Sequence, residues 1–207
     1  MSAILFSDLH YSNHTKGTCF ELLRFIHDLA LKEGHSVYFL GDFWNHVYNR
    51  GTLPVDLLNE MVRYFTNEWK VPMVMIPGNH DYYDSAEKEH GLESFHHISD
   101  YIQVISEPKV VNNILFLPYR RDVKSIEDVV SSTSCSAIMG HLDIIGAKMN
   151  HFKVSTVGID SKFFQVPTYS GHYHTPSVKG NVIYIGSPYQ VHLSEAEDNK
   201  SLTVLTY

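Results

Sequence analysis

Residues 72–81 read PMVMIPGNHD, an apolar segment followed at once by residue types that bind metals. Residues 72–76 have the length and composition of a buried β-strand, and the Pro-Gly pair at 77–78 ends it. Residues 79–81, Asn-His-Asp, are therefore expected at the carboxyl end of a strand. Ligands bind at that edge in open α/β sheets, so this stretch predicts both a fold class and the position of a site.

Two earlier strands are predicted to end in the same way. Residues 3–6 form a short apolar run followed by Asp8 and His10, and residues 36–40 form another followed by Asp42. Because the carboxyl ends of parallel strands meet at one edge of a sheet, we expect all three polar motifs to converge. This shared placement is stronger evidence for a site than any single motif.

The segments between these strands have helical periodicity. Apolar residues recur at helical spacing over 18–33, where Gly34 ends the helix, and over 54–69, where Pro54 begins it. The second half of the chain is richer in strands, with one short helix predicted over 125–132. Its strands are predicted at residues 113–117, 137–139, 167–170, 182–186 and 202–206. The whole pattern is that of an α/β protein.

The composition predicts one globular domain over residues 1–207. The net charge is −7, with 43% hydrophobic and 19% charged residues, which argues against a broad basic surface for autonomous nucleic-acid binding. A nucleic-acid substrate stays open, because divalent metals add positive charge locally. Cys19 and Cys135 fit free thiols in a reducing compartment, and neither a signal peptide nor a long apolar stretch is evident. We therefore expect a cytoplasmic protein without a membrane partner.

The motifs supply the donors of a two-metal site. Two ions about 3.5–4 Å apart can bind a phosphate ester and activate a shared water. Carboxylate oxygens suit hard divalent ions, and imidazole nitrogens extend the choice to transition metals. His80 would remain to protonate the leaving oxygen or to stabilise the transition state. The predicted metal ligands are Asp8, His10, Asp42, Asn79, His141, His172 and His174.

At these motifs the chain resembles the calcineurin-like metallophosphoesterase superfamily, over nearly its whole length. The resemblance implies a four-layer α/β/β/α sandwich, in which two mixed sheets are flanked by helices. It implies that His80 is the catalytic histidine and that Asp81 supports the site. It also divides the ligands into two sets, Asp8, His10, Asp42 and His174 for one ion and Asp42, Asn79, His141 and His172 for the other.

Within the superfamily, several segments resemble the SbcD-type subunits of DNA-repair nucleases. The motif at 78–81 (GNHD), combined with 171–174 (GHYH), is typical of the nuclease and phosphodiesterase branches. Residues 117–119 (LPY) and 184–190 (YIGSPYQ) resemble further segments of those subunits. The resemblance therefore points to a nuclease.

The chain departs from that pattern in two places. Three residues after Asp42, where the repair nucleases often have histidine and phosphatases aspartate, this chain has Asn45, followed by His46. We expect Asn45 and His46 to influence His80 or the phosphate, and with Tyr173 they are the candidate substrate contacts. The capping domain and the partner-docking segment of the repair nucleases are not expected here.

We predict a Mn²⁺-dependent phosphodiesterase that uses metal-bound hydroxide, with Fe, Ni or Zn as alternative metals. The substrate would be nucleic acid, DNA in preference to RNA, cleaved by exo- or endonuclease action. An SbcC-like ATPase of the SMC type is the expected partner, and a homodimer is left open. Two alternatives remain. One is a phosphodiesterase or phosphatase acting on cyclic or mononucleotides, which the acidic charge favours, and the other is a non-catalytic binding module on the same fold.

Overall fold

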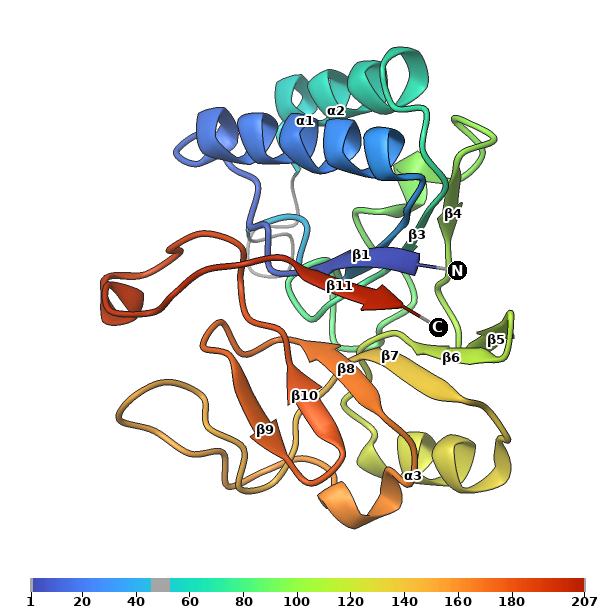
Figure 1. Ribbon diagram of the computed structural model, residues 1–207, viewed down its shortest axis with the longest axis vertical. Helices are drawn as coiled ribbons and strands as arrows, with labels where there is room; N and C mark the ends of the chain where they lie inside the picture. The colour runs from blue at the N-terminus through green and yellow to red at the C-terminus, as the bar shows by residue number, and fades with distance from the viewer. Residues whose placement is uncertain (1, 46–52, 207) are drawn as a thin grey trace.

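The computed structural model describes residues 2–45 and 53–206, which form two β-sheets between two helical layers (Figure 1). Helices α1 (Lys16–Glu33) and α2 (Val55–Asn67) cover the outer face of one sheet, and α3 (Val123–Ser132) covers the other. This α/β/β/α arrangement confirms the predicted fold class. No helix among the described residues is long and apolar enough to cross a membrane.

The first sheet is mixed and has the strand order β11-β1-β2-β3-β4. Its members are β1 (Ser2–Phe6), β2 (Ser36–Leu40), β3 (Met73–Ile76), β4 (Ile102–Val104) and β11 (Thr203–Thr206). Strands β1 to β4 run parallel, whereas β11 returns antiparallel beside β1. The segment that precedes β11 therefore lies near the carboxyl end of β1.

The register of the first sheet brings the carboxyl ends of its strands to one level. Phe6 lies opposite Phe39 on β2, and Leu40 lies opposite Ile76 on β3. Each pair stands at or next to the last residue of its strands, so the three polar motifs that follow leave the sheet side by side, as predicted.

The second sheet is also mixed and has the order β5-β6-β7-β8-β10-β9. Its members are β5 (Lys109–Val111), β6 (Ile114–Leu117), β7 (Ala137–His141), β8 (Thr168–Gly171), β9 (Ser177–Lys179) and β10 (Val182–Tyr184). The four central strands run parallel, and His141 on β7 lies opposite Gly171 on β8. His141 and the GHYH motif therefore emerge together. Short 3-10 helices lie in the connections, at Glu93–Phe95, Ser161–Phe163 and Leu193–Glu195.

Strand alternation on β1 divides its side chains between two cores. Ile4 and Phe6 pack under the helices, whereas Ala3 and Leu5 face the second sheet, and all four are buried. A third core lies between the second sheet and α3. A strand that is buried on both faces has a continuous run of apolar residues in its sequence. This run is why residues 3–6 could be predicted as a strand.

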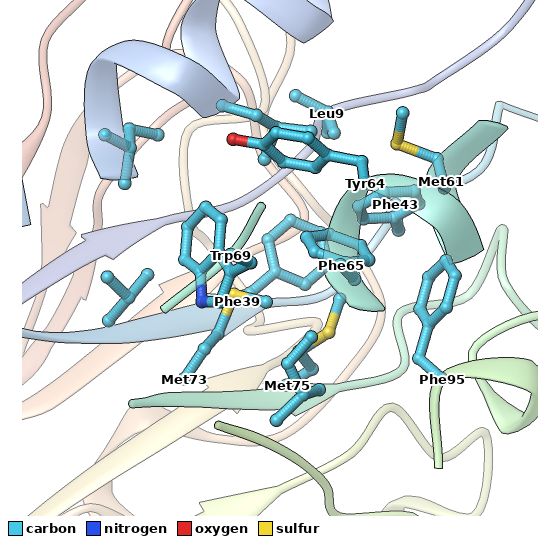
Figure 2. Close-up of a cluster of buried hydrophobic side chains, with 14 of the residues drawn as sticks. Leu9, Phe39, Phe43, Met61, Tyr64, Phe65, Trp69, Met73, Met75 and Phe95 are labelled. Atoms are coloured by element: carbon cyan, nitrogen blue, oxygen red, sulfur yellow. The ribbon is translucent and has the colours of Figure 1, made fainter. Parts of the chain in front are cut away.

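The core between the first sheet and its helices is rich in aromatic rings (Figure 2). The rings of Phe65 and Phe95 lie 5.0 Å apart, and Phe65 also contacts Trp69 and Phe43. Burying each such side chain contributes roughly 2–3 kcal/mol. This packing holds α2 against the sheet whose carboxyl edge carries the site.

The predicted elements are all present, with small shifts at their ends. Gly34 ends α1 in the left-handed conformation at φ 70°, as expected. Helix α3 begins two residues earlier than predicted, because the Asp122 carboxylate caps it by accepting from the Lys124 and Ser125 amides. The three-residue strands β4, β5 and β9 were not predicted, since each is too short to give a periodic signal.

Candidate metal centre

The loops at the shared sheet edge bend through left-handed backbone conformations. Positive φ angles occur at Asp8 (55°), His10 (47°), Asp42 (60°) and His172 (88°), none of them glycine. Such conformations cost free energy for residues with a Cβ and persist where the surroundings enforce them. Here each bend turns a candidate ligand away from its strand and toward the space between the two sheets' ends.

Two glycines let these loops approach each other closely. A Cβ added at Gly41 would overlap the His141 ring, and one added at Gly78 would overlap the Asp42 carboxylate. Gly41 also has φ 93°, which side chains rarely tolerate. The glycine before each of these motifs is therefore required by the packing of ligands from neighbouring strands.

The first ligand group consists of Asp8, His10 and His174, whose donor atoms lie within 4.8 Å of one another. His10 Nε2 is 3.0 Å from His174 Nε2, which is 3.7 Å from the Asp8 carboxylate. The other ring nitrogen of His10, Nδ1, is buried and has no hydrogen-bond partner among the described residues. Two imidazole nitrogens and a carboxylate facing one point could hold a divalent cation.

The second ligand group consists of Asp42, Asn79, His141 and His172. His141 Nε2 lies 3.3 Å from the Asp42 carboxylate and 3.0 Å from the Asn79 side-chain oxygen, which is 2.8 Å from His172 Nδ1. Asp42 also shares a 4.8 Å cluster with His10 and His80. Asp42 therefore stands between the two groups, where a bridging carboxylate would have to be.

The hydrogen bonds of the second group leave its remaining acceptor atoms facing one another. His141 Nδ1 donates to the Leu40 carbonyl at 2.7 Å, and His172 Nε2 donates to the Asp143 carboxylate at 2.9 Å. In neutral imidazoles the remaining nitrogens are acceptors, yet both face the Asn79 oxygen, which is another acceptor. A metal ion between them would make these contacts favourable, so the residues fit a metal.

The electrostatics of the centre also suit a cation. Burial alone would raise the pKa of Asp42, but His141, His80 and His10 lower it. Burial would lower the pKa of His141, but Asp42 raises it to about 9. Burial lowers the pKa of His10 well below its ordinary value, which keeps that imidazole neutral. Without a metal, a proton on His141 neutralises Asp42, and a divalent ion could take the place of that proton.

His80 lies at the rim of the centre with its side chain 29% exposed. Its Nδ1 donates to the Asn45 backbone carbonyl at 2.7 Å, and its Nε2 is 4.0 Å from the Asp42 carboxylate. The backbone amide of His80 donates to the same carboxylate at 2.8 Å. Asn45 thus orients the ring through its main chain, so the side-chain change at this position leaves that contact intact. His46 lies outside the described residues.

The two other predicted site residues are buried behind the ligands. Asp81 accepts hydrogen bonds from the backbone amides of Asp42 (2.9 Å), Gly78 (2.9 Å) and Trp44 (3.0 Å), which ties two strand ends together. Tyr173 is 3% exposed and donates its hydroxyl to Asp143 at 2.8 Å. Little of the Tyr173 side chain is therefore available for contact with a substrate.

Two carboxylates that contact the histidines were not predicted. Asp143 accepts from His172, as described above, and Glu195 accepts from His174 Nδ1 at 2.8 Å. Burial alone would raise the pKa of Glu195, but hydrogen bonds from His174 and Lys200 lower it to about 2. Asp143 follows His141 by two residues, a spacing that could have been noticed, whereas Glu195 has no local signal.

Comparison with known proteins finds relatives of low sequence identity. The chain is 25% identical to the SbcD component of the SbcCD nuclease of Staphylococcus epidermidis, over 89% of this chain and 58% of the relative. It is 24% identical to the same component from Staphylococcus saprophyticus, over 88% and 57%. The chain thus spans less than three fifths of these relatives' length. A solved structure of a protein of unknown function from Aquifex aeolicus has a TM-score of 0.45 and 17% identity, over 82% of this chain and 88% of that one.

The family model of calcineurin-like phosphoesterases matches residues 1–176, which contain every candidate metal ligand. Members of this family typically bind two divalent metals, and the two ligand groups could provide for them. The chain belongs to the calcineurin-like phosphoesterase family.

Proposed function

We propose that this chain is a Mn²⁺-dependent phosphodiesterase that cleaves DNA, with residues 1–207 acting as one catalytic domain. One observation carries the proposal: imidazole nitrogens and oxygens from both sheets face each other across a space that would suit cations. Fe, Ni and Zn suit the same mixed set of donors.

In this proposal each side chain has a defined task. The first ligand group and the second ligand group would each hold one ion, with Asp42 shared between them. Two ions held in this way would polarise the phosphate and lower the pKa of a water molecule. Because Nδ1 of His80 donates to Asn45, Nε2 is the nitrogen that would face the leaving oxygen. In the imidazolium form Nε2 would donate its proton to that oxygen, and the ring would be left neutral with its proton on Nδ1. Asp81 would keep Asp42 and His80 in register through the three amides it binds.

The choice of DNA is supported by the relatives rather than by the surface charge. Both Staphylococcus proteins are named as components of a nuclease, SbcCD. The net charge of −7 does not favour strong autonomous binding to DNA. We therefore propose that an SbcC-like ATPase helps this chain to engage its substrate.

A small cleft favours a second candidate function, hydrolysis of a nucleotide-sized ester. The cleft has a volume of about 200 Å³ and adjoins His141, with Tyr119, Arg120 and Arg121 on its wall. Both arginines already form ion pairs, with Glu107 and Glu87 respectively. A cyclic or mononucleotide would have to compete with these carboxylates for them.

The test is Mn²⁺-dependent hydrolysis of end-labelled linear DNA by the metal-loaded protein. Bis(p-nitrophenyl) phosphate and cyclic nucleotides are run in parallel. His80→Ala should lower turnover by about 100-fold or more, the usual contribution of general acid–base catalysis. His97→Ala, which changes an exposed histidine, is the matched control and should keep the parent rate.

The outcomes separate the candidate functions. Cleavage of DNA that is lost in His80→Ala supports the nuclease. Cleavage of a cyclic nucleotide with DNA left intact supports the second candidate. Equal rates for His80→Ala and the parent would show that His80 has been assigned the wrong role.

A further inference from the structure

We propose that Glu195 and Asp143 are positioning residues, Glu195 for the first ligand group and Asp143 for the second. Each carboxylate accepts a hydrogen bond from one histidine of the GHYH motif. The inference rests on the proposed metal-dependent function, including the division of the two histidines between different ions.

Glu195 holds His174 in one tautomer and one orientation. Its Oε1 accepts from His174 Nδ1 at 2.8 Å, so the proton resides on Nδ1 and the lone pair on Nε2. That Nε2 is the atom that faces His10 and Asp8. The carboxylate therefore directs the metal-binding nitrogen of His174 at the first ligand group.

The surroundings of Glu195 show that it is held as a support. The side chain is 3% exposed, and its second oxygen binds Lys200 Nζ at 2.7 Å and the Val191 amide at 3.1 Å. Lys200 already neutralises this carboxylate, so a further cation on Glu195 would be repelled. The proximity of His192, whose ring stacks on His174 at 5.4 Å, therefore does not make a third metal site here.

Asp143 acts on the opposite nitrogen of its histidine. Its Oδ1 accepts from His172 Nε2 at 2.9 Å and from the Tyr173 hydroxyl at 2.8 Å. The proton of His172 therefore resides on Nε2, and the lone pair of Nδ1 faces Asn79 at 2.8 Å. Tyr173 fixes the carboxylate from behind, which gives this buried tyrosine a role in the second ligand group.

Opposite nitrogens explain how two histidines of one short motif serve two ions. A carboxylate that accepts from a metal-binding imidazole fixes its tautomer and raises its basicity, and loss of such a partner typically weakens metal binding about 10–100-fold. Glu195 and Asp143 reach their histidines from different loops. Each should therefore affect the affinity of one ion only.

The experiment measures Mn²⁺ binding by calorimetry on the full chain stripped of metal. In a His10→Ala background, which weakens the first ligand group, Asp143→Asn should weaken the remaining ion about 10-fold or more. Glu195→Gln should change it less than about twofold there, because its histidine belongs to the other group. In an Asn79→Ala background, which weakens the second ligand group, the expectation is reversed. There Glu195→Gln should weaken the remaining ion about 10-fold or more, and Asp143→Asn should change it less than about twofold.

Matched controls separate positioning from folding. Asp198→Asn changes a carboxylate that binds Lys200 at 3.4 Å and Thr175 at 2.8 Å without contacting a candidate ligand. Asp128→Asn changes an exposed acid on α3. Both should keep the parent affinities. If Glu195→Gln does not fold, the test can rest on Asp143→Asn alone. The Asp143 side chain is 26% exposed, so its replacement should perturb folding less.

Several results would overturn the inference. These are unchanged affinities in both variants, equal weakening of both ions, or an equal loss caused by Asp198→Asn. A parent protein that binds two ions but cleaves neither DNA nor bis(p-nitrophenyl) phosphate would refute the phosphodiesterase while leaving this inference standing. A parent that binds no ion would refute both.

Discussion

Replacing Asp81 removes the acceptor that ties two loops of the candidate centre together. Its carboxylate is fully buried and accepts from three backbone amides, those of Asp42, Gly78 and Trp44. Asp81→Ala leaves all three donors without a partner. Asp81→Asn keeps the oxygen that binds two of them and turns an NH₂ group toward the third.

The magnitude follows from counting the amides that lose their acceptor. A buried donor left unsatisfied costs about 1–3 kcal/mol. Asp81→Asn should therefore lower the free energy of unfolding by roughly 1–3 kcal/mol, and Asp81→Ala by about 3 kcal/mol or more. Burial and repulsion from Asp42 raise the pKa of Asp81, so relief of that repulsion offsets part of either loss.

The assay is urea unfolding followed by circular dichroism, in EDTA so that bound metal does not contribute. Asp128→Ala, on the exposed face of α3, serves as the control and should stay within about 0.5 kcal/mol of the parent. An Asp81→Ala protein within about 1 kcal/mol of the parent would refute the reasoning, since a loss that small matches one neutral hydrogen bond. The reverse order, with Asn less stable than Ala, would also refute it.

Three further predictions concern the same region. Gly41→Ala should cost about 2 kcal/mol or more and abolish binding of one ion, because its Cβ would displace the His141 ring; urea unfolding and calorimetry check this. Glu195 has an ordinary pKa of 4.5 and a folded pKa of about 2, so it stabilises the fold above pH 4.5 and loses this effect as the pH falls toward 2. The stability difference between parent and Glu195→Gln should therefore shrink from pH 5 to pH 3, and a constant difference would contradict the assignment. Mn²⁺ at 100 times its dissociation constant should add about 2.7 kcal/mol and raise Tm by roughly 5–10 °C for each bound ion, and EDTA should reverse the shift.

The parallel half of the fold was predictable because its signals are local. Each buried strand is a continuous apolar run, and the register brings residues such as Leu40 and Ile76 to one level, so the following motifs meet. The position of β11 was not predictable in this way. Residues 203–206 read as a strand, but nothing nearby in the sequence says that they pair with β1 in the first sheet.

The candidate centre likewise has features that the sequence predicts and features that it does not. Candidate metal donors could be recognised because each stands at or soon after the end of a strand, as His141 does at the end of β7. The orientation of those donors depends on contacts made over long distances in the chain, such as Glu195 on His174 and the Asn45 carbonyl on His80. Every residue has a backbone carbonyl. The residue type at position 45 therefore could not reveal that the main chain, and not the side chain, contacts His80.

Ligands are easier to predict from sequence than the residues that orient them, and this difference has a physical cause. A ligand must be one of a few residue types, whereas its support can be any acceptor within hydrogen-bond reach. Supports are therefore free to come from loops that differ in length and sequence, as Asp143 and Glu195 do here. If these two carboxylates set the affinities of the two ions separately, the properties of the centre depend on segments outside its motifs. Exchanging the loop around residue 195 should then change metal affinity while the ligand set stays the same.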